Sequence, residues 1–184
     1  MKLDLITNKD VIDKDKNNND EHYTPIYAIE PILKYLKPNS NILCPFDISD
    51  SNYVKIFEKN GHKVTFSHLE TNKDFFTYTK EEIKDYDYII SNPPYSIKYE
   101  VFKHLFELGK PFAMLVGVVG LFESDKRFNL FKNNKFETMY FNRRISYYKS
   151  YSDEKTKLNP PFSSVYVTSN LLPNQIVFEI ISKK

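Results

Sequence analysis

The chain has 184 residues, of which 41% are hydrophobic and 16% aromatic, and it carries 26 basic residues against 24 acidic ones. This much apolar material can bury a core, which excludes an intrinsically disordered chain, and the length fits one domain. The net charge of +2 neither requires nor excludes a polyanionic partner. A single Cys excludes a disulfide framework, and four His residues without ligand spacing predict no metal site.

Two features of the sequence predict a soluble protein of the cytoplasm. The first residues, MKLDLITNKD, lack the apolar segment of a signal peptide. The longest apolar run, 111–122, is shorter than the roughly 20 residues of a membrane-spanning helix, so we predict no membrane partner. Residues 1–21 are polar and charged and predict a flexible leader, followed by one domain over 22–184.

The first predicted element is a helix with apolar residues at helical spacing as far as Leu36 and an end at Pro38, with Thr24 as its N-cap and Pro25 at its first helical position. Strands and helices then alternate with short links, which predicts an α/β fold, a mostly parallel twisted sheet with helices on both faces. Ligands of such sheets bind beyond the carboxyl ends of the strands. We predict strands over 41–46, 63–68, 87–91, 111–116, 136–141, 163–168 and 175–181, and helices over 51–60, 79–84, 96–108 and 124–131.

The strand predicted over 87–91 runs directly into Asn92-Pro93-Pro94-Tyr95. The two prolines have no N–H and a fixed φ, so the Asn92 side chain and the Pro93 carbonyl can both face outward as acceptors. Tyr95 adds a flat ring. Two acceptors beside an aromatic ring suit a planar ligand with an exocyclic amino group, although the same four residues also suit a plain rigid turn.

A strand followed by Asn-Pro-Pro-Tyr resembles the catalytic motif of amino-directed DNA methyltransferases, and the chain as a whole resembles the small phage-type N6-adenine enzymes. The resemblance implies a single-domain Rossmann-like methyltransferase fold, S-adenosylmethionine as cofactor and double-stranded DNA with an adenine target as partner. It implies that the adenine is flipped out of the duplex and stacks on Tyr95. Asn92, Pro93, Pro94 and Tyr95 would be the catalytic residues, with Asn92 and the Pro93 carbonyl accepting from the adenine amino group.

A second Asn-Pro-Pro-aromatic run, 159–162, follows a charged segment and no predicted strand. In the family, an arginine-containing strand and a Pro-rich loop lie beside the flipped base or the DNA backbone. By this resemblance the predicted nucleic-acid contacts are Arg143, Arg144, Phe162 and Ser163. A simple β-hairpin with exposed arginines is the open alternative. Lys126 and Arg127 would contact phosphate, with a solvated basic surface as the alternative.

The predicted cofactor turn follows the first strand and reads Cys44-Pro45-Phe46-Asp47-Ile48-Ser49-Asp50-Ser51. It has the Pro-Phe pair of the family but no glycine, and Ile48 and Asp50 stand where glycines are expected. A β-branched residue resists a positive φ, so we expect a turn of another shape or a damaged pocket. The cofactor residues implied by the resemblance are Tyr23, Thr24, Pro25, Pro45, Phe46, Asp47, Asp50, Ser51, Glu70, Asp74 and Phe75.

Individual roles follow from the same resemblance. The tripeptide 23–25 would cover the methionine end of the cofactor, or is a plain helix cap. Glu70 would hold the ribose hydroxyls, or is a surface residue. Asp74 would take the exocyclic amine of the cofactor adenine and Phe75 its ring face. Asp47, Asp50 and Ser51 are polar enough to bind the amino or carboxylate end of a methionine moiety.

Three functions remain open at this stage. The first is methyl transfer to adenine N6 in DNA. The second is a catalytically inactive binding module of a phage or mobile element with an anti-defence or regulatory role, which the glycine-free turn favours. The third is an RNA or protein-glutamine methyltransferase, because the motif reads an amino group and not a polymer. A protein partner and a homodimer both stay open.

Overall fold

The computed structural model describes residues 22–68, 73–156 and 158–183. Its elements in chain order are α2 (Ile26–Leu33), β1 (Asn41–Cys44), α3 (Asn52–Lys59), β2 (Lys63–Phe66), η1 (Phe75–Thr77), β3 (Tyr88–Ser91), η2 (Tyr95–Ile97), α4 (Lys98–Leu108), β4 (Phe112–Gly117), α5 (Asp125–Lys132), β5 (Glu137–Phe141), β6 (Ser164–Ser169) and β7 (Ile176–Glu179). Glu70, the residue predicted to hold the ribose of the cofactor, and the predicted leader 1–21 lie outside the described residues.

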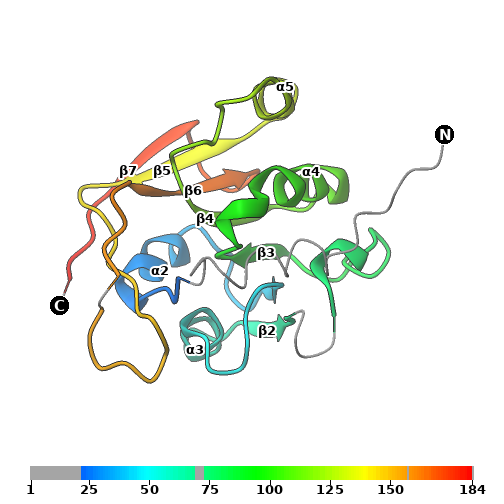
Figure 1. Cartoon of the computed structure of the whole chain (residues 1–184). Helices are drawn as coiled ribbons and strands as arrows, with labels where there is room; N and C mark the ends of the chain where they lie inside the picture. The colour runs from blue at the N-terminus through cyan, green and yellow to red at the C-terminus, as the bar shows by residue number, and fades with distance from the viewer. Residues whose placement is uncertain (1–21, 69–72, 157, 184) are drawn as a thin grey trace.

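The strands form one seven-stranded sheet in the order β2-β1-β3-β4-β6-β5-β7 (Figure 1). Four neighbouring pairs are parallel, β1 with β2, β1 with β3, β3 with β4, and β5 with β7. Strand β6 is antiparallel to both of its neighbours. The central strands β3 and β4 are buried along their whole length, which is why they read as continuous apolar runs in the sequence.

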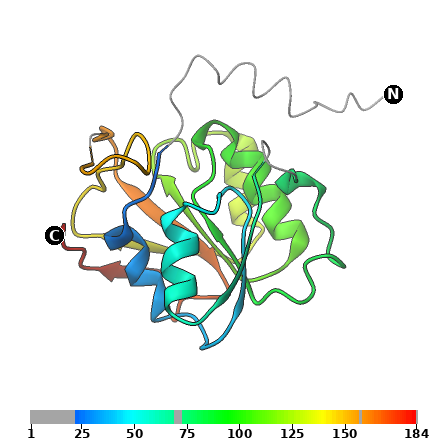
Figure 2. The same cartoon turned by 90° about the horizontal axis from the view of Figure 1, so that it is seen from below.

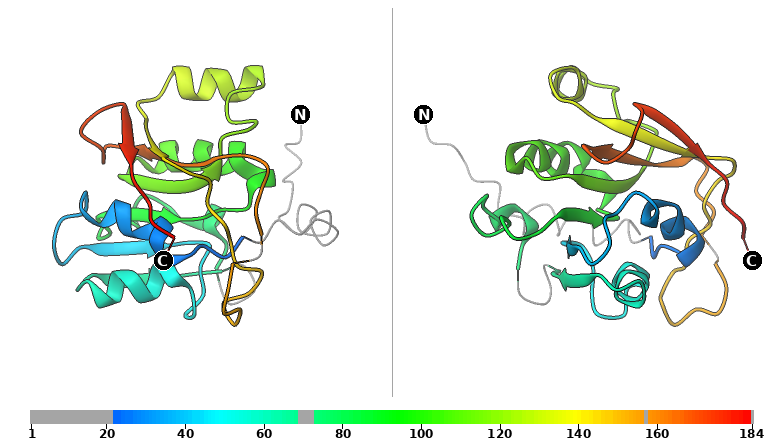
Figure 3. Two further views of the ribbon diagram at one scale, coloured as in Figure 1. Left: turned by 90° about the vertical axis from the view of Figure 1, so that its left-hand side faces the viewer. Right: turned by 180° about the vertical axis from the view of Figure 1, so that it is seen from behind.

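Helices cover both faces of this sheet. Helices α2 and α3 lie side by side on one face (Figure 2), and α4 and α5 lie on the opposite face (Figure 3). The first face packs Ile29, Ile32 and Phe57 against β1, β3 and β4. The second packs Phe102 and Phe131 against the other sides of the same strands. The predicted α/β sheet with helices on both faces is therefore confirmed.

The helix ends show where sequence reasoning succeeded and where it failed. Helix α4 ends at residue 108 as predicted, and the next residue, Gly109, has the left-handed φ of 73° that is typical of a helix-terminating glycine. Helix α2 begins one residue later than predicted, with Pro25 at the N-cap, and it ends at Leu33, before the end predicted at Pro38. The helix predicted over 79–84 is wrong, because this segment forms turns.

The topology fixes where a ligand would sit. Strand β1 lies between β2 and β3, so the chain leaves β1 toward one side and returns on the other. Such a switch point opens a crevice at the carboxyl ends of the two diverging strands. Here the turn after β1 and the Asn-Pro-Pro-Tyr segment after β3 follow the two strands at this switch point.

Candidate active site

The Asn92–Tyr95 corner stands at the carboxyl end of β3. Buried strand residues 88–91 lead into it, and η2 and α4 follow directly. Pro93 is buried and Pro94 half-buried, with Pro94 acting as the N-cap residue of η2. Because the prolines cannot continue the ladder of hydrogen bonds, the chain leaves the sheet at Asn92.

The Asn92 side chain is held by one half of its amide and leaves the other half without a partner. Its Nδ2 donates to the His22 carbonyl at 2.7 Å and to the Thr24 hydroxyl at 3.2 Å. Its Oδ1 is buried and has no hydrogen-bond partner. Buried acceptors in folded proteins are normally paired, so this oxygen points to a missing donor.

Tyr95 is half-buried and lies among other aromatic rings. The His22 ring stacks on it, with centroids 5.1 Å apart and planes 13° apart, and the Phe162 ring lies at 5.8 Å. The Tyr95 hydroxyl is 3.0 Å from the Tyr147 hydroxyl, which in turn donates to Ser164 at 2.7 Å. The Tyr95 ring is thus fixed by its hydroxyl and bounded by aromatic neighbours.

Phe162, from the second Asn-Pro-Pro-aromatic run, owes its position to Gly117 at the end of β4. A Cβ on Gly117 would lie 2.7 and 2.9 Å from two atoms of the Phe162 ring. Only a residue without a side chain lets this ring lie against the strand beside Tyr95. The two motif copies therefore meet in space, although 67 positions separate Tyr95 from Phe162 in the sequence.

We predict that Gly117→Ala destabilises the fold by about 1–3 kcal/mol, because the added methyl overpacks against the Phe162 ring. In the Phe162→Ala background the same change should cost almost nothing, since the ring it strikes is gone. Urea unfolding of the four proteins gives this double-mutant cycle. Equal costs in the two backgrounds would contradict the packing described above.

A buried carboxyl connects the turn after β1 to the strand that carries Asn92. Asp47 is 6% exposed, and its two carboxylate oxygens accept from the hydroxyls of Ser51 and Ser91. Ser51 also caps α3 and accepts from the Tyr151 hydroxyl at 3.0 Å. Burial raises the pKa of Asp47 to about 6, although both serine hydrogen bonds act in the opposite direction.

This raised pKa gives a testable pH dependence. The folded chain holds the Asp47 proton more tightly than the unfolded chain, whose pKa is about 3.9. The protonated carboxyl therefore stabilises the fold below about pH 4, and the contribution is lost as pH rises through about 6. Between pH 3 and pH 7 the wild-type free energy of unfolding should fall by about 3 kcal/mol more than that of Asp47→Asn. Urea unfolding across this range measures it, and parallel pH curves would contradict it.

The predicted cofactor segment 23–25 contacts the corner on one side and residues 52, 148 and 151 on the other. Tyr23 pairs by backbone hydrogen bonds with Tyr148, and its ring meets Tyr151 edge-on at 4.7 Å. The Thr24 carbonyl accepts from Asn52 at 2.9 Å, while its hydroxyl accepts from Asn92. The prediction that Thr24 caps α2 is wrong, because that hydroxyl is used by Asn92 and the N-cap is the buried Pro25, without a side-chain cap.

The turn after β1 has a shape that does not need glycine. Among the described residues, Asn39 and Asn170 are the non-glycine residues with a positive φ, so Ile48 and Asp50 have ordinary backbone conformations. Pro45 is buried and Phe46 half-buried. Asp50 is exposed and pairs with Lys55 at 3.5 Å. The turn therefore has no positive φ at these two positions, and its role in cofactor binding stays a prediction.

The predicted pair for the cofactor adenine lies at η1. Asp74 accepts from the Phe76 backbone N–H at 3.0 Å and so caps η1, and it is half-buried. Phe75 is 2% exposed and packs against Phe46 and His104 at centroid distances of 5.0 Å. In the described state Phe75 is a core residue, so its contact with a cofactor ring stays a prediction.

The predicted nucleic-acid residues divide into two groups. Arg143 and Arg144 follow β5 and are exposed, as is Ser163, whose carbonyl accepts from Val118. Phe162 alone lies against Tyr95. The intervening chain folds back through a two-way backbone pairing of Tyr147 with Leu158, which matches the hairpin alternative.

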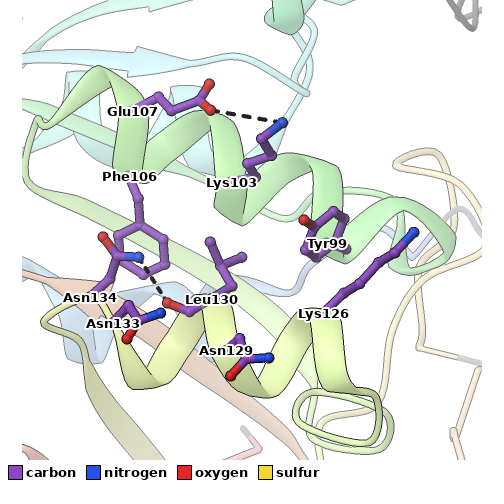
Figure 4. Close-up of a pocket in the computed structure, with 9 residues that line it drawn as sticks. All are labelled: Tyr99, Lys103, Phe106, Glu107, Lys126, Asn129, Leu130, Asn133 and Asn134. Atoms are coloured by element: carbon purple, nitrogen blue, oxygen red, sulfur yellow. Dashed lines mark hydrogen bonds and ion pairs between the residues drawn. The ribbon is translucent and has the colours of Figure 1, made fainter.

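An open hollow of about 450 Å³ lies between α4 and α5 and does not include the corner (Figure 4). The hollow is lined by Tyr99, Lys103, Phe106, Glu107, Lys126, Asn129, Leu130, Asn133 and Asn134.

In the described part of the chain, no group of three or more His, Cys, Asp or Glu residues is placed to hold a metal ion. No helix in that same part is both long enough and apolar enough to cross a bilayer.

Sequence reasoning missed several residues that adjoin or contact the Asn92–Tyr95 corner. Ser91 immediately precedes the motif, and a hydroxyl at the end of an apolar strand was a signal that could have been used. Lys98 is buried, donates to the carbonyls of Gly117 at 3.3 Å and Val119 at 2.6 Å, and lies 5.7 Å from the Tyr95 ring centroid. For His22 the sequence offers no local signal.

No protein-family model matches the chain, and no curated protein matches it in sequence. Among solved structures, a predicted O-methyltransferase from Agrobacterium tumefaciens has 10% identity and a TM-score of 0.48 over 81% of this chain and 83% of that one. A release factor-specific protein-(glutamine-N5) methyltransferase from Alicyclobacillus acidocaldarius has 17% identity and a TM-score of 0.46 over 78% and 88%.

A third structure is assigned as a modification subunit of a type I restriction enzyme from Vibrio vulnificus, with 10% identity and a TM-score of 0.50. The match covers 96% of this chain and 51% of that protein, so this chain spans about half its length. At such low identity the likeness concerns the fold and not the activity. Together with the strand order and the helices on both faces, this likeness shows that the chain has a Rossmann-like α/β fold, which that modification subunit shares.

Proposed function

We propose that the chain transfers a methyl group from S-adenosylmethionine to the N6 amino group of adenine in DNA. The observation that carries this proposal is the buried Asn92 Oδ1 without a partner, in the same short segment as Tyr95 at the carboxyl edge of the sheet. An exocyclic amino group has the N–H donor that this acceptor lacks, and a purine ring suits the tyrosine face.

The residues of the corner would act by position and electrostatics. The Asn92 amide is fixed by the His22 carbonyl and the Thr24 hydroxyl, so Oδ1 faces the incoming amino group without reorganisation. Together with the Pro93 carbonyl it would draw the two N–H bonds away from the ring plane, which directs the nitrogen lone pair toward the methyl donor. Tyr95 would hold the base plane in register. No strong base is required.

The buried polar cluster fits the methionine end of the cofactor by its chemistry. S-adenosylmethionine, when bound, supplies the methyl group on a cationic sulfonium and carries an α-ammonium. Burial raises the pKa of the Asp47 carboxyl at the switch point, and a neighbouring cation would favour its ionised form. Asp47 and Ser51 would hold this end, and Asp50 lies at the exposed side of the same turn.

Labelled S-adenosylmethionine tests the proposal with three acceptors in parallel, double-stranded DNA, RNA and a glutamine-containing peptide. We expect label in DNA, on adenine. Cofactor binding without label in any acceptor would contradict methyl transfer. Label in RNA or peptide alone would keep methyl transfer and replace the substrate.

A second candidate function is a binding module that keeps the fold without catalysis. The observation in its favour is that the glycine-free turn is filled by its own side chains, since both oxygens of Asp47 are already bonded and Ser51 is fully buried. Calorimetry separates the two candidates. Micromolar binding of S-adenosylmethionine supports the enzyme, and no binding at millimolar cofactor supports the binding module.

A further inference from the structure

The ring face of Tyr95 is covered by another flat ring of the same chain. The His22 ring lies nearly parallel to it, with 13° between the planes, and forms a T-shaped pair with the Tyr147 ring at a centroid distance of 5.1 Å and an angle of 79°. Tyr95 and Tyr147 together hold the imidazole, Tyr95 by stacking and Tyr147 by an edge contact. Imidazole is a planar heteroaromatic ring, like one half of a purine.

We propose that the His22 side chain occupies the position of the target base in the ligand-free chain and that a nucleobase must displace it. This inference rests on the proposed function, because it identifies the stacking partner of Tyr95 with the substrate base. His22 is then a self-bound competitor, and it sets the affinity of the site for nucleobases without contacting the reacting atoms.

The backbone around His22 can stay in place while its ring leaves. The His22 carbonyl accepts from Asn92 at 2.7 Å, and the next residue, Tyr23, is paired with Tyr148 by hydrogen bonds of 3.0 and 3.3 Å. A rotation of the imidazole about χ1 breaks neither contact. The His22 carbonyl and the Thr24 hydroxyl therefore keep the Asn92 amide oriented with Oδ1 available, and only the His22 ring exchanges with the base.

Asn92 Oδ1, the acceptor that the proposed function assigns to the amino group of the base, is buried without a partner in the same structure. An acceptor without a partner is costly when it is buried, unless a ligand supplies the donor. In a site closed by its own side chain, the apparent affinity for the ligand falls by the fraction of molecules in which the site is open. Removing the His22 ring should raise that fraction to one.

The test compares the affinity of the wild-type chain, His22→Ala and the control His62→Ala for oligodeoxyadenylate, by fluorescence anisotropy. A single strand removes the cost of base flipping and the need for a recognition sequence. His62 lies at the opposite edge of the sheet, where its Nδ1 accepts from the backbone N–H of Ser40, just before β1. We expect His22→Ala to bind about fivefold tighter or more, and His62→Ala to bind like wild type.

A second measurement follows the ring itself by NMR of histidine-labelled protein. In the free wild-type chain the His22 ring protons should be shifted upfield by the Tyr95 ring current, and oligodeoxyadenylate should reverse the shift. If the wild-type chain and His22→Ala bind the oligonucleotide equally, or His22→Ala binds it more weakly, the competitor role of His22 is wrong and the proposed function stands. If neither the wild-type chain nor His22→Ala binds it, the nucleobase site and this inference both fail.

Discussion

Asn92→Ala is expected to lower the rate of methyl transfer by at least about 100-fold, the usual effect of removing one group that stabilises charge or geometry at the reacting centre. The change removes the acceptor Oδ1 and also the Nδ2 that holds the amide to residues 22 and 24. Cofactor affinity should change little, because the loss falls on the target amino group. Single-turnover transfer of labelled methyl to DNA measures the rate, and calorimetry measures the cofactor.

The chain contains its own matched control. Asn159 begins the second Asn-Pro-Pro-aromatic run, but it is exposed and its Oδ1 accepts from Ser146. Asn159→Ala should keep the transfer rate within a few-fold of wild type. Equal losses in the two variants would mean that Asn92 supports the fold and does not act on the substrate.

Tyr95→Ala is expected to weaken binding of a DNA strand by about 5- to 150-fold, since stacking of one base on an aromatic ring contributes roughly 1–3 kcal/mol. Tyr95→Phe should lose far less, because it keeps the ring and removes the hydroxyl, which lies 3.0 Å from the Tyr147 hydroxyl. Anisotropy with a labelled oligonucleotide measures both affinities.

Tyr99 serves as the control for Tyr95. It lies on α4 shortly after the corner and lines the separate hollow between α4 and α5 (Figure 4). Tyr99→Ala should bind the oligonucleotide with wild-type affinity. If Tyr99→Ala weakens binding as much as Tyr95→Ala does, the nucleic acid binds at the hollow and not at the corner.

The order of strands and helices could be predicted because each central strand carries its own signal. Strands such as 112–117 are buried on both faces, and their continuous apolar runs show this directly. The segment 79–84 failed because six residues are few for a helix to nucleate, and Glu82 accepts from both the N–H and the hydroxyl of Thr79 in a local turn.

The corner itself could be predicted, and its surroundings could not. Asn92–Tyr95 is one continuous segment directly after a strand, so its place at the sheet edge follows from the sequence. The partners of Asp47 are different, because Ser91 is 44 positions away. The Thr24 hydroxyl looked like a cap, and the fold instead brings it to Asn92, 68 positions along the chain. Such contacts depend on the sheet order, which no local pattern encodes.

The most direct test of the central claim is nucleoside analysis of genomic DNA from a host without adenine methylation that expresses this chain. Genomic DNA presents all sequences, so the recognition site need not be known. We predict N6-methyldeoxyadenosine with the wild-type chain and none above background with Asn92→Ala. An unmethylated genome in cells that contain folded wild-type protein, shown in vitro to bind S-adenosylmethionine, would contradict the claim.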